Sequence, residues 1–123
     1  SKHFVRTMGA YRPRAVLLVD MVGERGMRIP MEGNSLQSAP ELTHLVFEVA
    51  AALGASGFVR EAGPALYDDH LPFLRVGIPA VDLIDFDYPA WHTLADTPER
   101  CAPESLFQVA QVLLHTLARL ARD

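Results

Sequence analysis

The sequence predicts an α/β fold, with three αβα layers built around a mostly parallel, twisted sheet. Short segments that are almost entirely apolar, such as residues 15–19 (AVLLV), are typical of strands buried on both faces. Such segments alternate along the chain with longer ones whose apolar residues recur at helical spacing. Alternating strands and helices are the pattern of a layered α/β protein with parallel strands.

Four segments are candidate strands. Residues 15–19 and 78–84 are the strongest, because both are apolar runs and Asp82 is the one polar intrusion in the second. Residues 27–31, which contain a proline, and the short run 58–61 are weaker. So few strands make a narrow sheet, and the pattern indicates part of a larger domain.

Two long helices are predicted, with a short helical turn between them from His70. The first is expected to start with a capping box in which Ser38 and Glu41 satisfy first-turn amides, and to end at Gly54. The second begins at Pro103. Their apolar faces are formed by Leu42, Leu45, Val46, Val49 and Leu53 in the first, and by Leu106, Val109, Ala110, Leu113, Leu117 and Leu120 in the second.

Composition narrows the class of protein. The chain has 123 residues, of which 50% are hydrophobic, so it fits one folded domain. A net charge of -4 argues against nucleic acid or an anionic membrane as the main partner. No apolar run approaches the ~20 residues of a membrane span. The sequence shows no signal-peptide pattern at its start, and its composition does not determine the cellular compartment. Cys101 is the only cysteine, so no disulfide can form within the chain.

Polar residues follow the predicted strands at the positions where open α/β sheets bind their ligands. Asp20 ends the first strand, and Trp91 and His92 lie in the loop after residues 78–84. A further group, Asp68, Asp69 and His70, follows a Gly-Pro turn. Carboxylates and imidazoles are zinc ligands, so a zinc site at this edge of the sheet is one interpretation.

Each of these residues also has a plain structural interpretation. Asp20 is equally well explained as a loop or capping carboxylate at a strand end. Asp69 is more simply a cap of the helical turn that follows it. His70 is better explained as a hydrogen-bonded structural histidine than as a ligand, and Trp91 can belong to the core.

Four segments of the chain carry a more specific pattern. They are residues 68–80 (DDHLPFLRVGIPA), 91–97 (WHTLADT), 18–23 (LVDMVG) and 1–4 (SKHF). They resemble the (S/D)DHxPFxxxGIPA, HTxxDT, LDMxG and GSKxF motifs of the family of zinc aminopeptidases that includes the glutaminyl cyclases. The motifs stand in the family's order along the chain, and the resemblance extends over nearly the whole chain.

The resemblance implies that residues 1–123 are a partial zinc-exopeptidase domain, its carboxyl-terminal half. The family's upstream histidine and aspartate ligands and its catalytic glutamate pair lie before the point that Ser1 matches. We therefore expect the isolated chain to be inactive. We also expect it to associate with itself or with the amino-terminal half. Members of the family are often secreted or periplasmic.

The resemblance also implies roles for individual residues. His92 would be a zinc ligand. Asp20 would be a second-metal ligand in a dinuclear site, or a hydrogen-bonded catalytic carboxylate beside a single zinc. Asp68 would lie near Asp20 and share a proton with it as a second catalytic carboxylate. Trp91 and Tyr88 would wall the pocket for the substrate side chain.

The resemblance is compatible with two enzyme activities, both of which act on peptide amino termini. Trp91 directly before His92, together with Asp68, favours a zinc-dependent glutaminyl cyclase. Met21 slightly favours a zinc aminopeptidase. A stand-alone domain that has lost catalysis and serves binding or assembly is the alternative from another class.

Overall fold

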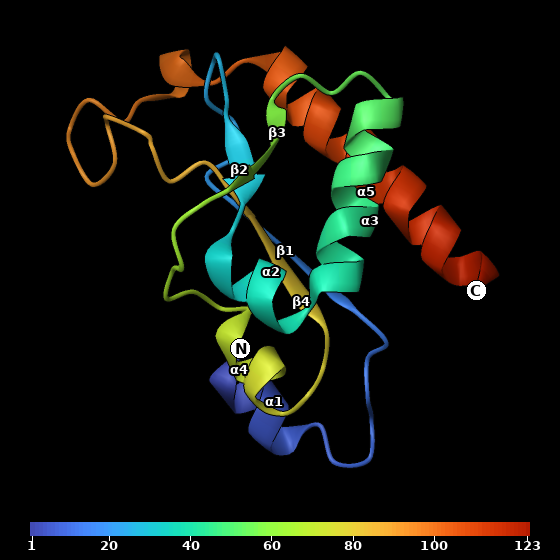
Figure 1. Cartoon of the computed structure of the whole chain (residues 1–123). Coiled ribbons are helices and arrows are strands. Elements are labelled where there is room, and N and C mark those ends of the chain that lie inside the picture. Colours follow the sequence, from blue (N-terminus) through green and yellow to red (C-terminus); the bar gives the residue numbers. More distant parts are fainter.

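The computed structural model describes residues 1–123 and has the α/β architecture that the sequence predicts (Figure 1). The elements in chain order are α1 (Lys2–Thr7), β1 (Val16–Asp20), β2 (Ile29–Met31), α2 (Gly33–Ser38), α3 (Pro40–Ala52), β3 (Phe58–Ala62), α4 (Leu71–Arg75), β4 (Ala80–Ile84), the 3₁₀ turn η1 (Pro98–Arg100) and α5 (Pro103–Arg122). None of the helices combines the length and the apolar character needed to cross a membrane.

Two parallel ladders form the strand layer. β1 pairs with β4 in continuous register, from Val16 opposite Ala80 to Asp20 opposite Ile84. β2 pairs with β3, and the register shifts within β2. Pro30 is the middle residue of β2, and its missing N–H explains why the ladder cannot continue regularly there. The predicted parallel pairing is thus confirmed.

β2 runs past β4 in the opposite direction. The Arg28 N–H, just before β2, donates to Oδ2 of Asp85, just after β4, at 3.0 Å. After β2, the hydroxyl of Ser35 accepts from the backbone N–H of Asp82, in the middle of β4, at 3.0 Å. The start of α2 is therefore held against the middle of β4.

The alternation of side chains along β4 separates two helical layers. Val81 and Leu83 are fully buried in the main hydrophobic core, to which the neighbouring helices α3 and α5 contribute Val46 and Val112 (Figure 1). Successive side chains of a strand point to opposite faces, so Asp82 points to the other side. There it meets the segment that leads into α4, which itself packs against α1.

The predicted capping box is wrong. Ser38 is the last residue of α2. The residue before α3 is Ala39, whose methyl side chain cannot accept a capping hydrogen bond. The reason is that α2 runs almost directly into α3. The sequence did not predict α2, because its six residues carry no apolar repeat. The helix ends before Gly54 as expected, and this glycine has the left-handed conformation, with φ of 68°.

Candidate functional site

The ladder between β1 and β4 places two loops at one edge of the sheet. Asp20, the last residue of β1, pairs with Ile84, the last residue of β4. The chain then turns sharply in both loops, since Met21 and His92 have φ of 51° and 54°. Positive φ is uncommon outside glycine and occurs mostly where the surrounding structure enforces it.

Four of the residues proposed from the sequence line one cavity at this edge. The cavity has a volume of about 390 Å³, and Asp20, Asp68, Trp91 and His92 all contribute to its wall. The other lining residues are Met21, Leu66, Tyr67, Ile84 and Phe86. Residues that lie 48 and 24 positions apart in the chain therefore meet around one space, as expected of a shared site.

The carboxyl groups of Asp20 and Asp68 lie within hydrogen-bonding reach of each other. Partial burial, and then the negative charge of Asp68, raise the pKa of Asp20. Two carboxyl groups at this separation favour sharing one proton over being ionised together. The pair can therefore accept and return a proton beside the cavity.

A third carboxyl group, Asp82, continues this pair into the interior. Its side chain is fully buried and lies within hydrogen-bonding reach of Asp68. Burial, and then the charge of Asp68, raise the pKa of Asp82 to about 7. Neither carboxyl oxygen of Asp82 has a hydrogen-bond donor in the structure. A proton on Asp82 would supply the missing hydrogen bond to Asp68.

His70 lies next to Asp82 and is also fully buried. Its Nε2 is 3.0 Å from Oε2 of Glu32, and its Nδ1 is 3.6 Å from Oδ2 of Asp82. Burial alone would lower the pKa of His70, but the hydrogen bond and charge of Glu32, followed by the charges of Asp82 and Asp68, raise it. The surrounding acids therefore stabilise the charged form of the imidazole.

Glu32 closes this row of side chains at the start of α2. It is buried, and its carboxylate accepts hydrogen bonds from the backbone N–H groups of Asn34, Ser35 and Leu66 and from the hydroxyl of Ser35, at 2.7 to 2.9 Å. Burial would raise the pKa of Glu32, but the bond with His70 and these further donors outweigh it and hold the pKa at about 2. Glu32 is therefore a buried anion.

The loop after β4 supplies the aromatic part of the site. The Trp91 and His92 rings stack with centroids 4.1 Å apart and an angle of 19° between their planes, and Phe86 packs on Trp91 at 5.1 Å. His92 and Trp91 are both exposed. The imidazole is thus accessible to an ion, beside an aromatic surface that suits an apolar or planar side chain.

Tyr88 lies apart from the site cavity. It lines an adjoining space of about 140 Å³ together with Trp91, and its hydroxyl donates to Oδ1 of Asp96 at 2.7 Å. Tyr88, which was predicted to wall the substrate pocket, thus lines this adjoining space and not the cavity that Asp20 and Asp68 share. Its ring faces the next cavity because the hydroxyl is held by Asp96.

These residues alone do not make a complete metal site. No group of three or more histidine, cysteine, aspartate and glutamate side chains is arranged to hold a metal ion. The accessible imidazole of His92 fits one zinc ligand, and Asp20, in the same cavity, is a possible oxygen ligand. A catalytic zinc normally has three protein ligands, so this donor set matches only part of a zinc centre.

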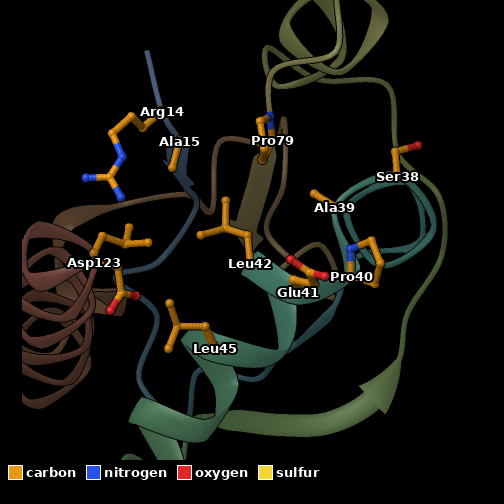
Figure 2. Close-up of a pocket in the computed structure, with 11 residues that line it drawn as sticks. Arg14, Ala15, Ser38, Ala39, Pro40, Glu41, Leu42, Leu45, Pro79 and Asp123 are labelled. Carbon is orange, nitrogen blue, oxygen red and sulfur yellow. The ribbon is translucent and has the colours of Figure 1, made fainter.

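A hollow larger than the site cavity lies at the opposite end of the strands. It has a volume of about 520 Å³ and is bordered by Ala15 and Pro79, which directly precede β1 and β4. Figure 2 shows Leu42 and Leu45 of α3 beside it, with Arg14 across the space. Because it lies at the amino ends of the parallel strands, it is separate from the acidic site.

Sequence reasoning missed Glu32 and Asp82 as parts of the site and treated His70 as structural. Asp82 carried a recognisable signal, since it is the one polar residue in an apolar strand. Glu32 carried only a weak one, an acid directly before a Gly-Asn-Ser helix start. Its meeting with His70 spans 38 positions and depends on tertiary structure.

Carboxylates and an accessible histidine thus gather at the carboxyl edge of the parallel strands of an α/β fold. The model of Peptidase family M28 matches residues 1–117, and the chain belongs to that family. It is 44% identical over 52 residues to the glutaminyl-peptide cyclotransferase-like protein of Mus musculus, a match that covers 42% of this chain and 14% of that protein.

Solved structures match over almost the whole chain. The Fimbriiglobus ruber glutaminyl cyclase aligns with a TM-score of 0.86 and 38% identity, over 93% of this chain and 40% of that chain. A leucine aminopeptidase precursor from Bacteroides thetaiotaomicron aligns with a TM-score of 0.89 and 30% identity, over 94% of this chain and 41% of that chain. The present chain thus spans less than half the length of these relatives.

Proposed function

We propose that this chain forms the carboxyl-terminal part of a zinc-dependent enzyme of the glutaminyl cyclase type, which acts on peptide amino termini. The observation that carries the proposal is the contact between the Asp20 and Asp68 carboxyl groups in the cavity that His92 and Trp91 also line. This cavity combines a proton-sharing pair, one metal-ligand candidate and an aromatic wall. Those are parts that an amide-processing site requires.

The chemistry proposed is cyclisation of an amino-terminal glutamine. The α-nitrogen forms a bond to the carbon of the side-chain amide, the bond from that carbon to the amide nitrogen breaks, and ammonia leaves. A proton must pass from the attacking nitrogen to the leaving nitrogen. Asp20 and Asp68 would hold that proton network in position, because their carboxyl groups can share one proton. Trp91 would orient the substrate side chain beside them.

Zinc would be held by His92 together with ligands from outside residues 1–123. When bound, zinc polarises a carbonyl group and so favours attack at its carbon. The accessible position of His92 beside Asp20 supports the assignment. In the alternative, dinuclear arrangement, Asp20 would be a second-metal ligand rather than a proton carrier.

Zinc aminopeptidase activity is the second candidate function. The similarity to the leucine aminopeptidase precursor supports it, as does Met21 after the strand end. The cyclase is favoured because a carboxyl group stands at position 68 in contact with Asp20, and because Trp91 forms an aromatic wall next to His92. A non-catalytic binding or assembly domain remains the alternative from another class.

The assembly proposed follows from two open surfaces. β1 pairs only with β4, so its other edge is free to pair with a further strand. One side of α5 exposes large apolar residues, namely Leu106, Phe107, Leu114 and Leu117. We propose that these surfaces are covered by a second copy of the chain or by the amino-terminal part of the family fold.

The test is an assay of the polypeptide encoded by the complete reading frame that contains these residues. Ammonia release from a peptide with amino-terminal glutamine, lost on chelation and restored by zinc, is expected. Hydrolysis of a leucine amide without ammonia release from glutamine would assign the aminopeptidase instead. Absence of both activities, with zinc bound, would favour the binding domain. The isolated 123-residue chain should show neither activity.

A further inference from the structure

The buried row Glu32–His70–Asp82 lies behind the proposed site. Its three side chains come from three separate places, namely the start of α2, the turn before α4 and the middle of β4. Each is almost completely inaccessible to solvent. Buried charges of this kind are costly, and apolar residues of similar volume often serve stability as well or better.

The row is asymmetric in its hydrogen bonding. At one end, Glu32 is fully satisfied by backbone donors, a hydroxyl and Nε2 of His70. At the other end, Nδ1 of His70 and both carboxyl oxygens of Asp82 have no hydrogen-bond partner. The 3.6 Å between Nδ1 and Oδ2 is too long for a hydrogen bond but close for two charges.

We propose that Glu32 and His70 are positioning residues, which present a fixed positive charge to Asp82 and so keep its carboxyl group directed at Asp68. Glu32 holds the imidazole by Nε2, which leaves Nδ1 facing Asp82. The imidazolium then compensates one negative charge in a buried group of acids. Asp82 in turn lies between His70 and the pair in the cavity, because it interacts with both His70 and Asp68.

Every charged group that faces His70 supports this assignment. Glu32 approaches from the start of α2, Asp82 from β4 and Asp68 from the turn that leads into α4, and all three are acids. Glu32 and Asp82 lie on opposite nitrogen atoms of the ring. A neutral imidazole could donate to only one of them, whereas the imidazolium offers an N–H to each.

The catalytic consequence rests on the proposed function, but the charge state of His70 does not. The first experiment therefore uses the 123-residue chain without metal or substrate. Nitrogen-15 NMR of the His70 ring at pH 7 should show both nitrogens protonated. Asp82→Asn and Glu32→Gln should each lower the proton affinity of His70 by about tenfold or more, since each removes a negative charge in contact with it.

Asp85→Asn is the matched control. Asp85 is a buried acid three positions further along, but its carboxylate accepts from the Arg28 N–H and is not among the groups that face His70. The control should leave the His70 titration unchanged. A neutral ring in the unmodified chain at pH 7, or equal titration curves for Asp82→Asn and Asp85→Asn, would overturn the proposal. The first of these measurements needs no variant to fold.

A second experiment tests the effect on Asp82. Carbon-13 NMR of the Asp82 carboxyl group in His70→Gln should show tighter proton binding than in the unmodified chain, because the facing positive charge is gone. In the complete enzyme, the same change should lower kcat and leave KM unchanged, as expected of a residue that acts through Asp68. Unchanged proton binding at Asp82 contradicts the proposal even if the enzyme proves to be a peptidase.

Discussion

The imidazole of His70 and the carboxylate of Glu32 meet inside the protein, with Nε2 3.0 Å from Oε2 and both side chains almost entirely buried. Glu32 at the same time caps α2 through the N–H groups of Asn34 and Ser35. One carboxylate thus fixes the start of a helix and the orientation of an imidazole that comes from a distant part of the chain. Its removal should affect both.

Glu32→Ala should lower the free energy of unfolding by about 3–5 kcal/mol, because it leaves a buried positive charge and several unpaired N–H groups. Urea unfolding followed by circular dichroism measures this. Glu61→Ala is the control, since Glu61 is an exposed acid paired with Arg28 at the surface and should cost only about 0–1 kcal/mol. Equal losses in the two variants would show that the buried contact does not stabilise the fold.

The sequence predicted the elements of the fold better than their connections. The apolar run of β4 and the helical repeat of α5 are local patterns, which burial on two faces or one face enforces directly. Two features escaped prediction, namely α2 and the direction of β2 relative to β4. Glu32 caps α2 through nearby N–H groups, but its side chain is also bonded to His70, 38 positions away. The direction of β2 is fixed by a bond between Arg28 and Asp85, which lie 57 positions apart.

The stability of the chain should depend on pH in two opposing ways. The pKa of Glu32 is about 2 in the folded state against a usual 4.5. The ionised Glu32 carboxylate therefore stabilises the fold above pH 4.5, and this stabilisation is lost as the pH falls from 4.5 to about 2. The pKa of Asp82 is about 7 against a usual 3.8, so ionising it costs stability as the pH rises from about 4 to 7. We expect a maximum of stability near pH 4 to 5.

Asp82→Asn should remove the decline in the free energy of unfolding between about pH 4 and 7, because the amide does not ionise. The loss of stability below pH 4.5, which comes from Glu32, should remain. Urea midpoints measured across this range test it. At pH 8 the variant should be more stable than the unmodified chain, by an amount on the order of 1–3 kcal/mol. A variant that declines as steeply as the unmodified chain would show that Asp82 is not the group responsible.

Asp20→Asn should change the stability of the chain by no more than about 0.5 kcal/mol in either direction. Asp20 is exposed at the strand end, and the change relieves its contact with Asp68. In the complete enzyme it should lower kcat by roughly 10²–10⁴-fold, the usual contribution of a proton-transfer group. Asp87→Asn, an exposed acid outside the site cavity, is the control and should leave kcat unchanged.

The isolated chain should form a dimer or a larger oligomer. Large apolar residues on one side of α5, among them Phe107 and Leu114, are more than half exposed, and contiguous surfaces of this kind favour association. Sedimentation equilibrium at several concentrations measures it. Leu114→Lys should shift the distribution toward monomer, whereas His115→Lys, an exposed change about 100° around the helix, should not. A monomer at all concentrations would contradict the prediction.

The site was predictable in part, because strand ends mark where side chains gather. Asp20, Asp68 and His92 each follow an element of the sheet or a turn, and the parallel ladder brings their loops to one edge. Tyr88 shows the limit of this reasoning. It lies in the same loop as His92, but its hydrogen bond to Asp96 turns it to a neighbouring space, and no local pattern encodes that partner.

His92→Ala should separate metal binding from folding. The His92 side chain is exposed, and its main contact within the chain is the stack on Trp91, so its removal should change the free energy of unfolding by no more than about 0.5 kcal/mol. In the polypeptide from the complete reading frame, the same change should lower zinc affinity by about 100-fold or more, since it removes a ligand itself and not only a supporting group. Zinc content by mass spectrometry and thermal unfolding, measured on one preparation, test both parts.

His44→Ala, an exposed histidine on α3 outside the site cavity, should retain the metal. Full zinc content in His92→Ala would exclude this residue as a ligand and leave its left-handed backbone and its stack on Trp91 as structural features of the loop.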